Sequence, residues 1–421
     1  MSNITIPLLG AVDTAVVGHL PEAYYLGAVA IGAMIFNFLY WGFGFLRMST
    51  TGFTAQAQGA DDADELRATL ARALIIAAAV ALAILALQTP VLAAAMALVQ
   101  ASAEVEQHAR AYYGIRIWGA PAALGNYVVL GWFLGMQNAR AGLLLQVVIN
   151  GLNIVLDLVF VVGLGLGVEG VALATIIAEY SGLALGAAMV LVTLGRLGGR
   201  WRLARMVDAR RLRRMAGVNR DIFLRTLCLI SAFAYLTARG ARMGDVVLAA
   251  NAVLLNMVTF IAYALDGFAH AAEALIGRAV GARDRRAFDG AVRASTLWAL
   301  LFSAAFSAAY LALGPAIVDV LTSVAEVRAA ARDLLWWMVA APLVSIWSYQ
   351  LDGIFIGATR SPEMRNAMFV SLAVYLAAVE LLTPHWGAHG LWLAFTIFMA
   401  ARGVTLAFYF PRIGRAIEAR R

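Results

Sequence analysis

Polar residues interrupt the long apolar stretches of this chain in a pattern that could bind a proton or a small cation. Asp13 lies among apolar and small residues between Pro7 and His19. If this stretch spans a bilayer, its charge costs at least ~2.5–3.5 kcal/mol. A polar partner, a water-filled cavity or a bound cation must offset that cost. The alternative is a structural aspartate that caps a helix broken at Pro7.

Further carboxylate, amide and hydroxyl side chains interrupt two later apolar stretches, which we expect to be the fifth and sixth membrane spans. Within each stretch they are three or four positions apart, so they share one face of a helix. They are Asn150, Asn153 and Asp157 on the fifth span, and Thr175 and Glu179 on the sixth. Together with Asp13 they offer oxygen ligands for Na⁺, or carboxylates that take up a proton on burial. The alternative is a hydrogen-bonded network that only ties the helices together.

The second half of the chain carries polar residues at the same depth, and an arginine is among them. Asp266, His270 and Glu273 are spaced by four and three positions, again on one helical face. Arg402 opposite Asp352 or Asp266 would form a buried pair. Because an arginine counter-ion neutralises such a site, we expect this group to be structural. His270 could titrate near neutral pH, but a single histidine in a membrane is more often a satisfied hydrogen-bonding residue.

Aromatic, amide and methionine side chains could line an adaptable cavity, because they suit amphiphilic cations of varied shape. The candidates are Met34, Phe36, Asn126, Tyr127, Trp132 and Met257. Ordinary helix packing is the competing interpretation for each of them.

The composition requires these residues to lie on membrane-spanning helices. The 421 residues are 62% hydrophobic and only 14% charged, whereas soluble domains carry about 25% charged residues. A span needs ~20 mainly apolar residues, so the chain predicts an all-α membrane protein of twelve transmembrane helices. The expected spans are 3–20, 25–50, 68–98, 108–135, 141–163, 168–195, 217–238, 246–272, 288–313, 328–357, 364–383 and 388–410.

The arginines predict the orientation of these spans. All 32 basic residues are arginine, and they gather in the stretch 196–214, in the stretch 281–286 and in the C-terminal tail. Loops rich in basic residues stay in the cytoplasm, so both termini are expected there, in a bacterial inner membrane. The stretch 196–214 could also bind anionic lipid head groups, and a plain topology signal is the simpler interpretation. The net charge of +7 therefore does not indicate a nucleic-acid partner.

Weak internal repeats divide the chain into two halves. The matching segments are 220 to 222 positions apart: 59–62 with 281–284, 120–121 with 341–342, and 170–174 with 390–394. They predict an N-terminal six-helix lobe over 1–195, an Arg-rich cytoplasmic linker over 196–216 and a C-terminal six-helix lobe over 217–421. An even number of helices in each half gives a parallel repeat, an arrangement in which substrate binds between the halves.

The segments 9–20, 47–57, 264–269 and 352–360 together resemble the DinF branch of the multidrug and toxic compound extrusion (MATE) transporters. The resemblance implies two pseudo-symmetric six-helix lobes around a central cavity. It also implies antiport of drug-like, amphiphilic or cationic compounds against H⁺ or Na⁺ by alternating access. Asp13, Asn153, Asp157 and Thr175 match the cation-site positions of that family. Protonation of the first-helix aspartate is proposed there to bend the helix, which Pro7 and Gly10 would permit here.

One departure from the family pattern bears on the coupling ion. The NorM-type branch has acidic residues on the tenth and seventh helices. This chain has Asp352 on the tenth, but only Asp221 at the entry of the seventh. The resemblance therefore favours H⁺ coupling through the first lobe over a Na⁺ site in the second.

Two other functions remain as alternatives. A flippase for a lipid-linked precursor would need cationic groups in its cavity, and we expect the deep polar residues of the first lobe to be acidic or neutral. A membrane enzyme would have to use the acidic run 61–65, which resembles a Mg²⁺-diphosphate motif but has no second copy. Acidic residues at a helix start also favour the helix dipole. Cys228 is the single cysteine, so no disulfide framework or metal cluster is expected. We predict a non-enzymatic monomer without a cofactor, in contact with membrane lipid and small substrates.

Overall fold

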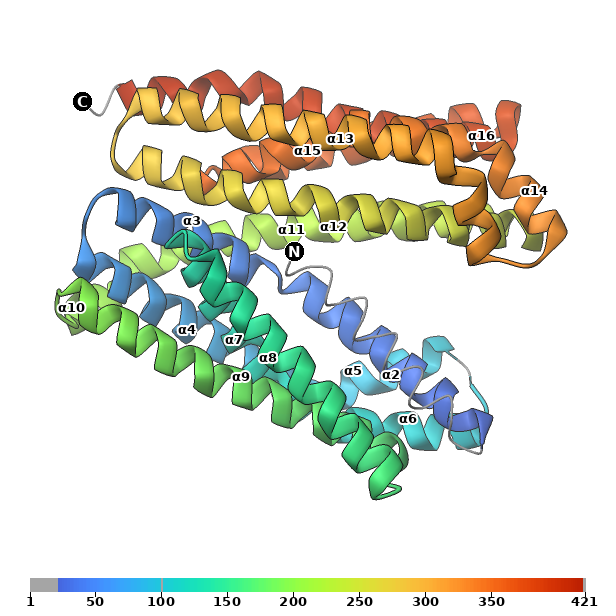
Figure 1. The fold of residues 1–421 in the computed structure, drawn as a ribbon, viewed down its shortest axis with the longest axis horizontal. Coiled ribbons are helices and arrows are strands. Elements are labelled where there is room, and N and C mark those ends of the chain that lie inside the picture. Colours follow the sequence, from blue (N-terminus) through green and yellow to red (C-terminus); the bar gives the residue numbers. More distant parts are fainter. Residues whose placement is uncertain (1–21, 100, 419–421) are drawn as a thin grey trace. The chain divides into compact units, whose positions relative to one another are not determined.

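The computed structural model describes residues 22–99 and 101–418, and every regular element in these ranges is a helix (Figure 1). The predicted first span, 3–20, and with it Asp13, lies outside the described residues. The α-helices are α2 (Ala23–Gly42), α3 (Phe45–Gly59), α4 (Ala63–Ala86), α5 (Gln88–Val99), α6 (Ala103–Arg116), α7 (Ala120–Gly135), α8 (Ala139–Asp157), α9 (Gly167–Leu197), α10 (Leu203–Met206), α11 (Ala209–Ala241), α12 (Asp245–Gly281), α13 (Arg285–Leu321), α14 (Ala325–Asp333), α15 (Leu335–Gly357) and α16 (Ser361–Glu418).

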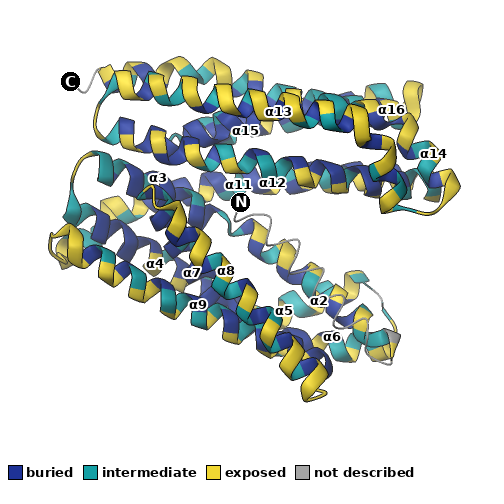
Figure 2. Cartoon of the chain, in the orientation of Figure 1, coloured by how far each residue is buried: buried dark blue, intermediate teal, exposed yellow. Residues whose placement is uncertain are grey.

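Ten helical stretches of the described chain are long and apolar enough to cross a membrane. The last of them, α16, contains a break at Gly387, where φ is 53° and ψ is −129°. This break separates the predicted spans 364–383 and 388–410, so α16 is two helices in succession. A short 3₁₀ turn, Ile117–Gly119, likewise joins α6 and α7 into one apolar stretch. Buried and exposed residues alternate around the helices (Figure 2), and the exposed apolar faces are those that lipid would cover.

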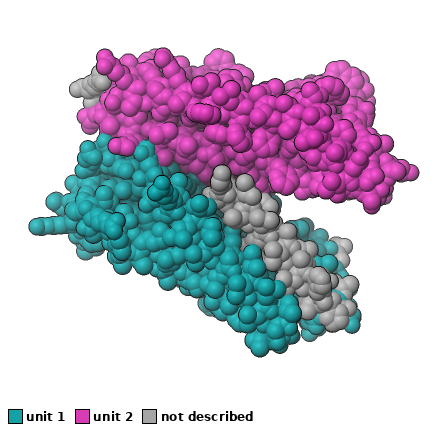
Figure 3. Space-filling view, in the orientation of Figure 1, with its two compact units in different colours: residues 1–216 teal, residues 217–421 magenta. Residues whose placement is uncertain are grey.

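The chain forms two compact units, Met1–Ala216 and Gly217–Arg421 (Figure 3). In the first unit α7 packs against α3, α4 and α9, and α8 packs against α9. In the second unit α15 packs against α12, α13 and α16. The stretch 196–216, predicted to be a linker, contains α10 and the first turns of α11.

The same close helix crossing occurs in both units. A Cβ atom added to Gly131 would lie 2.4 Å from the Arg47 carbonyl oxygen, and one added to Gly353 would lie 2.5 Å from the Ala269 carbonyl oxygen. One helical turn on, Gly357 meets the Glu273 carbonyl oxygen at 2.5 Å in the same way. Only glycine allows two helix backbones to approach so closely.

The turns between helices repeat as well. In the described part of the chain the residues other than glycine with positive φ are Asp61, Gln137, Arg283 and Thr359. They form two pairs, each 222 positions apart. Asp62 and Asp284, also 222 apart, cap the helices that follow, through hydrogen bonds from the backbone N–H of Glu65 at 2.9 Å and of Ala287 at 3.0 Å. The internal repeat inferred from weak sequence matches is therefore present in the backbone.

Candidate functional site

The predicted cation-site residues of the fifth and sixth spans meet inside the first unit. Asp157 is the last residue of α8 and is fully buried, and Asn153 lies one turn before it at 1% exposure. With the Asn153 amide oriented to satisfy both of its atoms, its nitrogen donates to Asp157 Oδ2 at 3.1 Å. Its oxygen then accepts from the Thr175 backbone N–H at 3.2 Å. The structure thus brings three of the four predicted residues together, and the fourth, Asp13, lies outside the described residues.

The backbone changes at this point. A π-helical turn, Leu158–Gly163, follows Asp157 directly. Such turns occur often at functional sites, because the wider turn frees the backbone and redirects side chains. Thr175 Oγ1 donates to the Val171 carbonyl oxygen at 2.9 Å, so the hydroxyl already has an acceptor on its own helix.

In the satisfied orientation the Asn153 nitrogen, a donor, faces Asp157, and its oxygen faces Thr175. A sodium ion beside Asp157 would require that oxygen to turn toward it, because hard cations bind oxygen ligands. In the ranges that the structure describes, no group of three or more histidine, cysteine, aspartate or glutamate residues could hold a metal ion.

Glu179 belongs to a different group, and it corrects one expectation. The Arg116 guanidinium donates to both of its carboxylate oxygens, at 2.9 and 3.1 Å. Arg116 ends α6, near the middle of the apolar stretch Ala103–Gly135, and is buried. The expectation that the deep polar residues of the first lobe are acidic or neutral is therefore wrong. The signal was available, since Arg116 interrupts the predicted fourth span and Glu179 interrupts the sixth.

In the second unit Arg402 was predicted to pair with Asp352 or Asp266, and the structure shows the pair with Asp352. Arg402 Nη2 donates to Asp352 Oδ2 at 2.7 Å, and both side chains are buried. Sequence analysis missed a third member, Arg225 on α11, which donates to the same oxygen. Its proximity to the arginine-rich stretch made it resemble a topology signal. Of the other predicted members, Glu273 is buried on α12, and Asp266 and His270 are partly buried on the same helix.

The six predicted cavity residues do not form one group. Trp132 is fully buried, and its Nε1 donates to the Leu66 carbonyl oxygen at 3.2 Å, so it acts in packing. Met257 is 1% exposed, within the hydrophobic core of the second unit, which also indicates packing. Asn126 and Phe36 are buried beside the Arg116 pair, whereas Met34 is 53% exposed. Tyr127 is partly buried on α7.

A small cavity lies in the second unit, with room for one or two water molecules (about 20 Å³). Its wall includes Trp337, Tyr349, Trp392 and Met399, and none of the six predicted cavity residues lines it.

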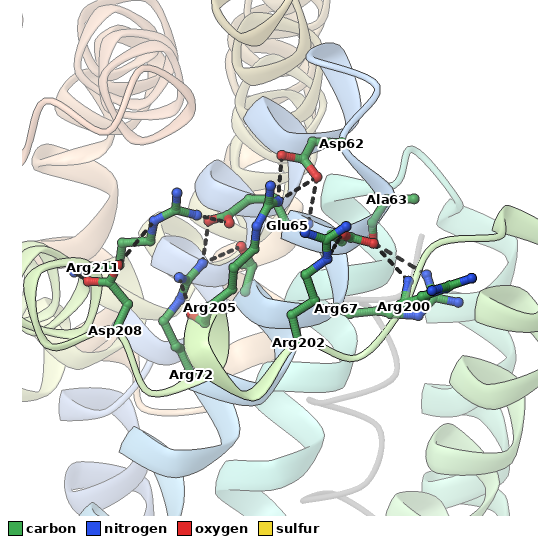
Figure 4. A network of polar contacts seen from close by, with 12 residues as sticks. Asp62, Ala63, Glu65, Arg67, Arg72, Arg200, Arg202, Arg205, Asp208 and Arg211 are labelled. Atoms are coloured by element: carbon green, nitrogen blue, oxygen red, sulfur yellow. Dashed lines mark hydrogen bonds and ion pairs between the residues drawn. The ribbon is translucent and has the colours of Figure 1, made fainter.

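Carboxylates of the acidic run 61–65, which could have indicated an enzyme, form ion pairs with arginines (Figure 4). Asp62 pairs with Arg205 at 2.8 Å and Asp64 with Arg202 at 2.6 Å. Glu65 pairs with both Arg72 and Arg211. Burial raises the pKa of Asp62, but the hydrogen bonds from the Glu65 N–H and from Arg205 outweigh it, so that the pKa lies below its ordinary value. The acidic run therefore begins α4, and its ion pairs hold the stretch 200–211 against this helix.

Comparisons of this chain with known sequences and structures all indicate the same family. The family model described as MatE matches residues 1–159 and 222–382. The DNA damage-inducible protein F of Escherichia coli is 47% identical over 96% of this chain and 88% of its own length. The probable multidrug resistance protein NorM of Caulobacter vibrioides is 28% identical over 68% of this chain and 61% of its own. The crystal structure of a MATE protein in the bent conformation has the same fold, with a TM-score of 0.89 at 20% identity over 100% of this chain and 94% of that one.

Proposed function

Because the chain belongs to the MATE family of membrane transporters, we propose that it exports amphiphilic or cationic compounds in exchange for H⁺. The contact of Asp157 with Asn153, and of Asn153 with Thr175, carries this proposal. A fully buried carboxylate at membrane depth is costly, and such residues mark ion and proton pathways. Uptake of a proton by Asp157, with Asp13 as its predicted partner, would couple the proton gradient to the movement of substrate.

The orientation of the Asn153 amide supports H⁺ over Na⁺ as the coupling ion. The second unit supports the same choice, because Asp352 is engaged by two arginines. A cation at Asp352 would have to displace both guanidinium groups. Coupling is therefore assigned to the first unit.

Placement in a bacterial inner membrane, with both termini in the cytoplasm, is part of the same proposal. Three of the four arginines that pair with residues 62–65 come from the stretch 200–211. Such a concentration of basic residues is typical of the cytoplasmic side.

A lipid-linked precursor flippase is the second candidate, and Arg116 is the observation in its favour. A buried guanidinium could hold a diphosphate. Both of its Nη atoms, however, already donate to Glu179. Binding a diphosphate would bring its charge next to that carboxylate, so the antiporter is better supported.

Transport by the full-length chain in sealed vesicles tests the proposal. Asp13→Asn and Asp157→Asn should each abolish efflux driven by a pH gradient while the protein still expresses and folds. Glu106→Gln is a matched control, because Glu106 is an exposed carboxylate that pairs with Arg110 on the surface of α6. Replacing the pH gradient with a Na⁺ gradient in the same vesicles identifies the coupling ion. Unchanged efflux by both variants would overturn the mechanism.

A further inference from the structure

Arg116 is held in the first unit in the way that a protein holds a bound organic cation. Glu179 accepts two hydrogen bonds from its guanidinium, at 2.9 and 3.1 Å. The same guanidinium lies 5.1 Å from the ring centre of Phe36 and 5.5 Å from that of Tyr40. A carboxylate with two aromatic faces is the usual recognition set for a desolvated cation.

The groups around this cation are fixed in place. Phe36 and Tyr40 lie four residues apart on α2, on one helical face, with ring centres 5.6 Å apart. Tyr113 stacks on Phe36 at 5.3 Å. On the other side, a Cβ atom added to Gly119 would lie 2.7 Å from Glu179 Oε2. The Glu179 carboxylate therefore lies directly against the backbone of Gly119, the last residue of the 3₁₀ turn.

Two buried polar atoms beside this cage have no hydrogen-bond partner within the described residues. They are the Tyr40 hydroxyl and Asn126 Oδ1, on side chains that are 8% and 7% exposed. The Asn126 nitrogen donates to the Glu179 carbonyl oxygen at 2.9 Å, so this amide is held next to the cage. Buried polar groups normally have partners, and two such atoms here indicate that another group binds at this place in some state of the protein.

We propose that Phe36, Tyr40 and Glu179 form the binding site for the cationic group of the transported compound, and that Arg116 fills this site when substrate is absent. A substrate cation would take the place of the guanidinium against the rings and the carboxylate. The Tyr40 hydroxyl and Asn126 Oδ1 would then offer acceptors to the displaced arginine. This inference rests on the proposed function, since it specifies where the exported cation binds.

Arg116 thereby sets selectivity by competition. The guanidinium belongs to the chain and can always return to the site, so only a compound that binds the rings and the carboxylate more strongly displaces it. Anionic compounds would be repelled by Glu179, and neutral ones would leave the carboxylate without a partner. A purely structural ion pair, which only ties α6 to α9, predicts no such dependence on substrate charge.

The test is equilibrium binding to the purified full-length chain in detergent, with no ion gradient. The probe is tetraphenylphosphonium, a permanent cation that carries no proton, and triphenylphosphine oxide is its neutral counterpart. Arg116→Met removes the competing cation and keeps the apolar stem, so we expect binding of tetraphenylphosphonium to tighten about tenfold. Glu179→Gln should weaken it by about tenfold or more. Binding of the neutral probe should change by less than about twofold in both.

Two further variants keep the test decisive if the loss of one ion-pair partner prevents folding. Phe36→Leu and Tyr40→Leu leave Arg116 and Glu179 paired, and each should weaken binding of the cation about three- to tenfold. Arg110→Met is the matched control, since Arg110 pairs with Glu106 on the exposed face of the same helix. Equal effects of the four cage variants on both probes, or none on either, would overturn the inference.

Failure of this inference can be distinguished from failure of the proposed function. Gradient-driven efflux with unchanged cation binding in the cage variants would refute this site alone. The expected binding pattern without any gradient-driven efflux would refute the antiport mechanism alone.

Discussion

Arg402 and Asp352 form a buried ion pair in the second unit, with Nη2 of the arginine 2.7 Å from Oδ2 of the aspartate. Arg225 donates to the same oxygen from a third helix. One carboxylate thus holds two guanidinium groups, on α11 and α16, against α15. Breaking a buried pair is costly because it leaves a charge without compensation.

This arrangement predicts unequal effects of removing its members. Asp352→Asn removes the carboxylate from both arginines and should destabilise the second unit by about 3–5 kcal/mol. Arg402→Met leaves Asp352 paired with Arg225 and should cost clearly less. Thermal unfolding in detergent measures both. A larger loss in Arg402→Met than in Asp352→Asn would contradict the shared-carboxylate arrangement.

The coupling ion can be tested at Thr175. If Asp157 takes up a proton, Thr175→Val should change H⁺-driven efflux only a few-fold, because Asn153 still has the backbone N–H of residue 175 as a donor. If the site instead binds Na⁺, the same change removes an oxygen ligand and should cost about tenfold or more in ion affinity. The measurement is efflux as a function of each ion concentration. An effect confined to Na⁺ dependence would refute proton coupling.

The close crossing of helices predicts that Gly131→Ala and Gly353→Ala both destabilise the fold, and to a similar extent. In each case the new methyl group would meet a backbone carbonyl oxygen, at 2.4 or 2.5 Å, which cannot move aside as a side chain can. We expect losses of about 1–3 kcal/mol or more. Gly151→Ala on α8 is the control, since its Cβ would meet nothing within 4 Å. A fully stable Gly131→Ala protein would show that the helices are farther apart than described.

Asp62 caps α4 outside the membrane-spanning segments, and it predicts that the stability of the first turn of α4 depends on pH. Its folded-state pKa lies below the ordinary value, so the stabilisation is complete above the unfolded pKa of about 3.9. It is lost as the pH falls through the lower folded value. Asp62→Asn keeps the cap and loses the pair with Arg205, whereas Asp62→Ala loses both, the cap alone being worth about 1 kcal/mol.

Amide hydrogen exchange at residues 63–66 reports this effect directly. Exchange should accelerate more in Asp62→Ala than in Asp62→Asn, and the difference between wild type and Asp62→Asn should shrink only as the pH falls below about 3.9. Equal exchange rates in the two variants would show that the side-chain cap contributes nothing.

The sequence predicted the elements of this fold because each depends on local chemistry. Apolar length indicated the spans, and most of the predicted ranges overlap a described helix. The repeat was detectable because tight turns accept few residue types, as at Asp61 and Arg283. The break in α16 at Gly387 lies in the gap between the predicted spans 364–383 and 388–410.

The sites were less predictable because they depend on which helices meet. A buried pair for Arg402 was predictable, but the choice between Asp352 and Asp266 needed the structure, which shows Asp352. Arg116 and Arg225 were not recognised, because an isolated arginine within an apolar stretch gives no sign of its partner on another helix. The aromatic rings around Arg116 needed the packing of α2 on α6, which spacing along one helix does not reveal.

The matched turns and glycine crossings suggest how such a transporter arose. A single gene of half this length, doubled and fused, would give both halves the same tight corners and the same narrow contacts between helices. At the glycine crossings the neighbouring backbone leaves no room for a larger residue. The buried charges have since diverged, into an arginine–glutamate pair in one half and two arginines on one aspartate in the other. Under the proposed function, the first copy binds the coupling proton and the substrate cation, whereas the corresponding depth of the second copy is held by an aspartate between two arginines.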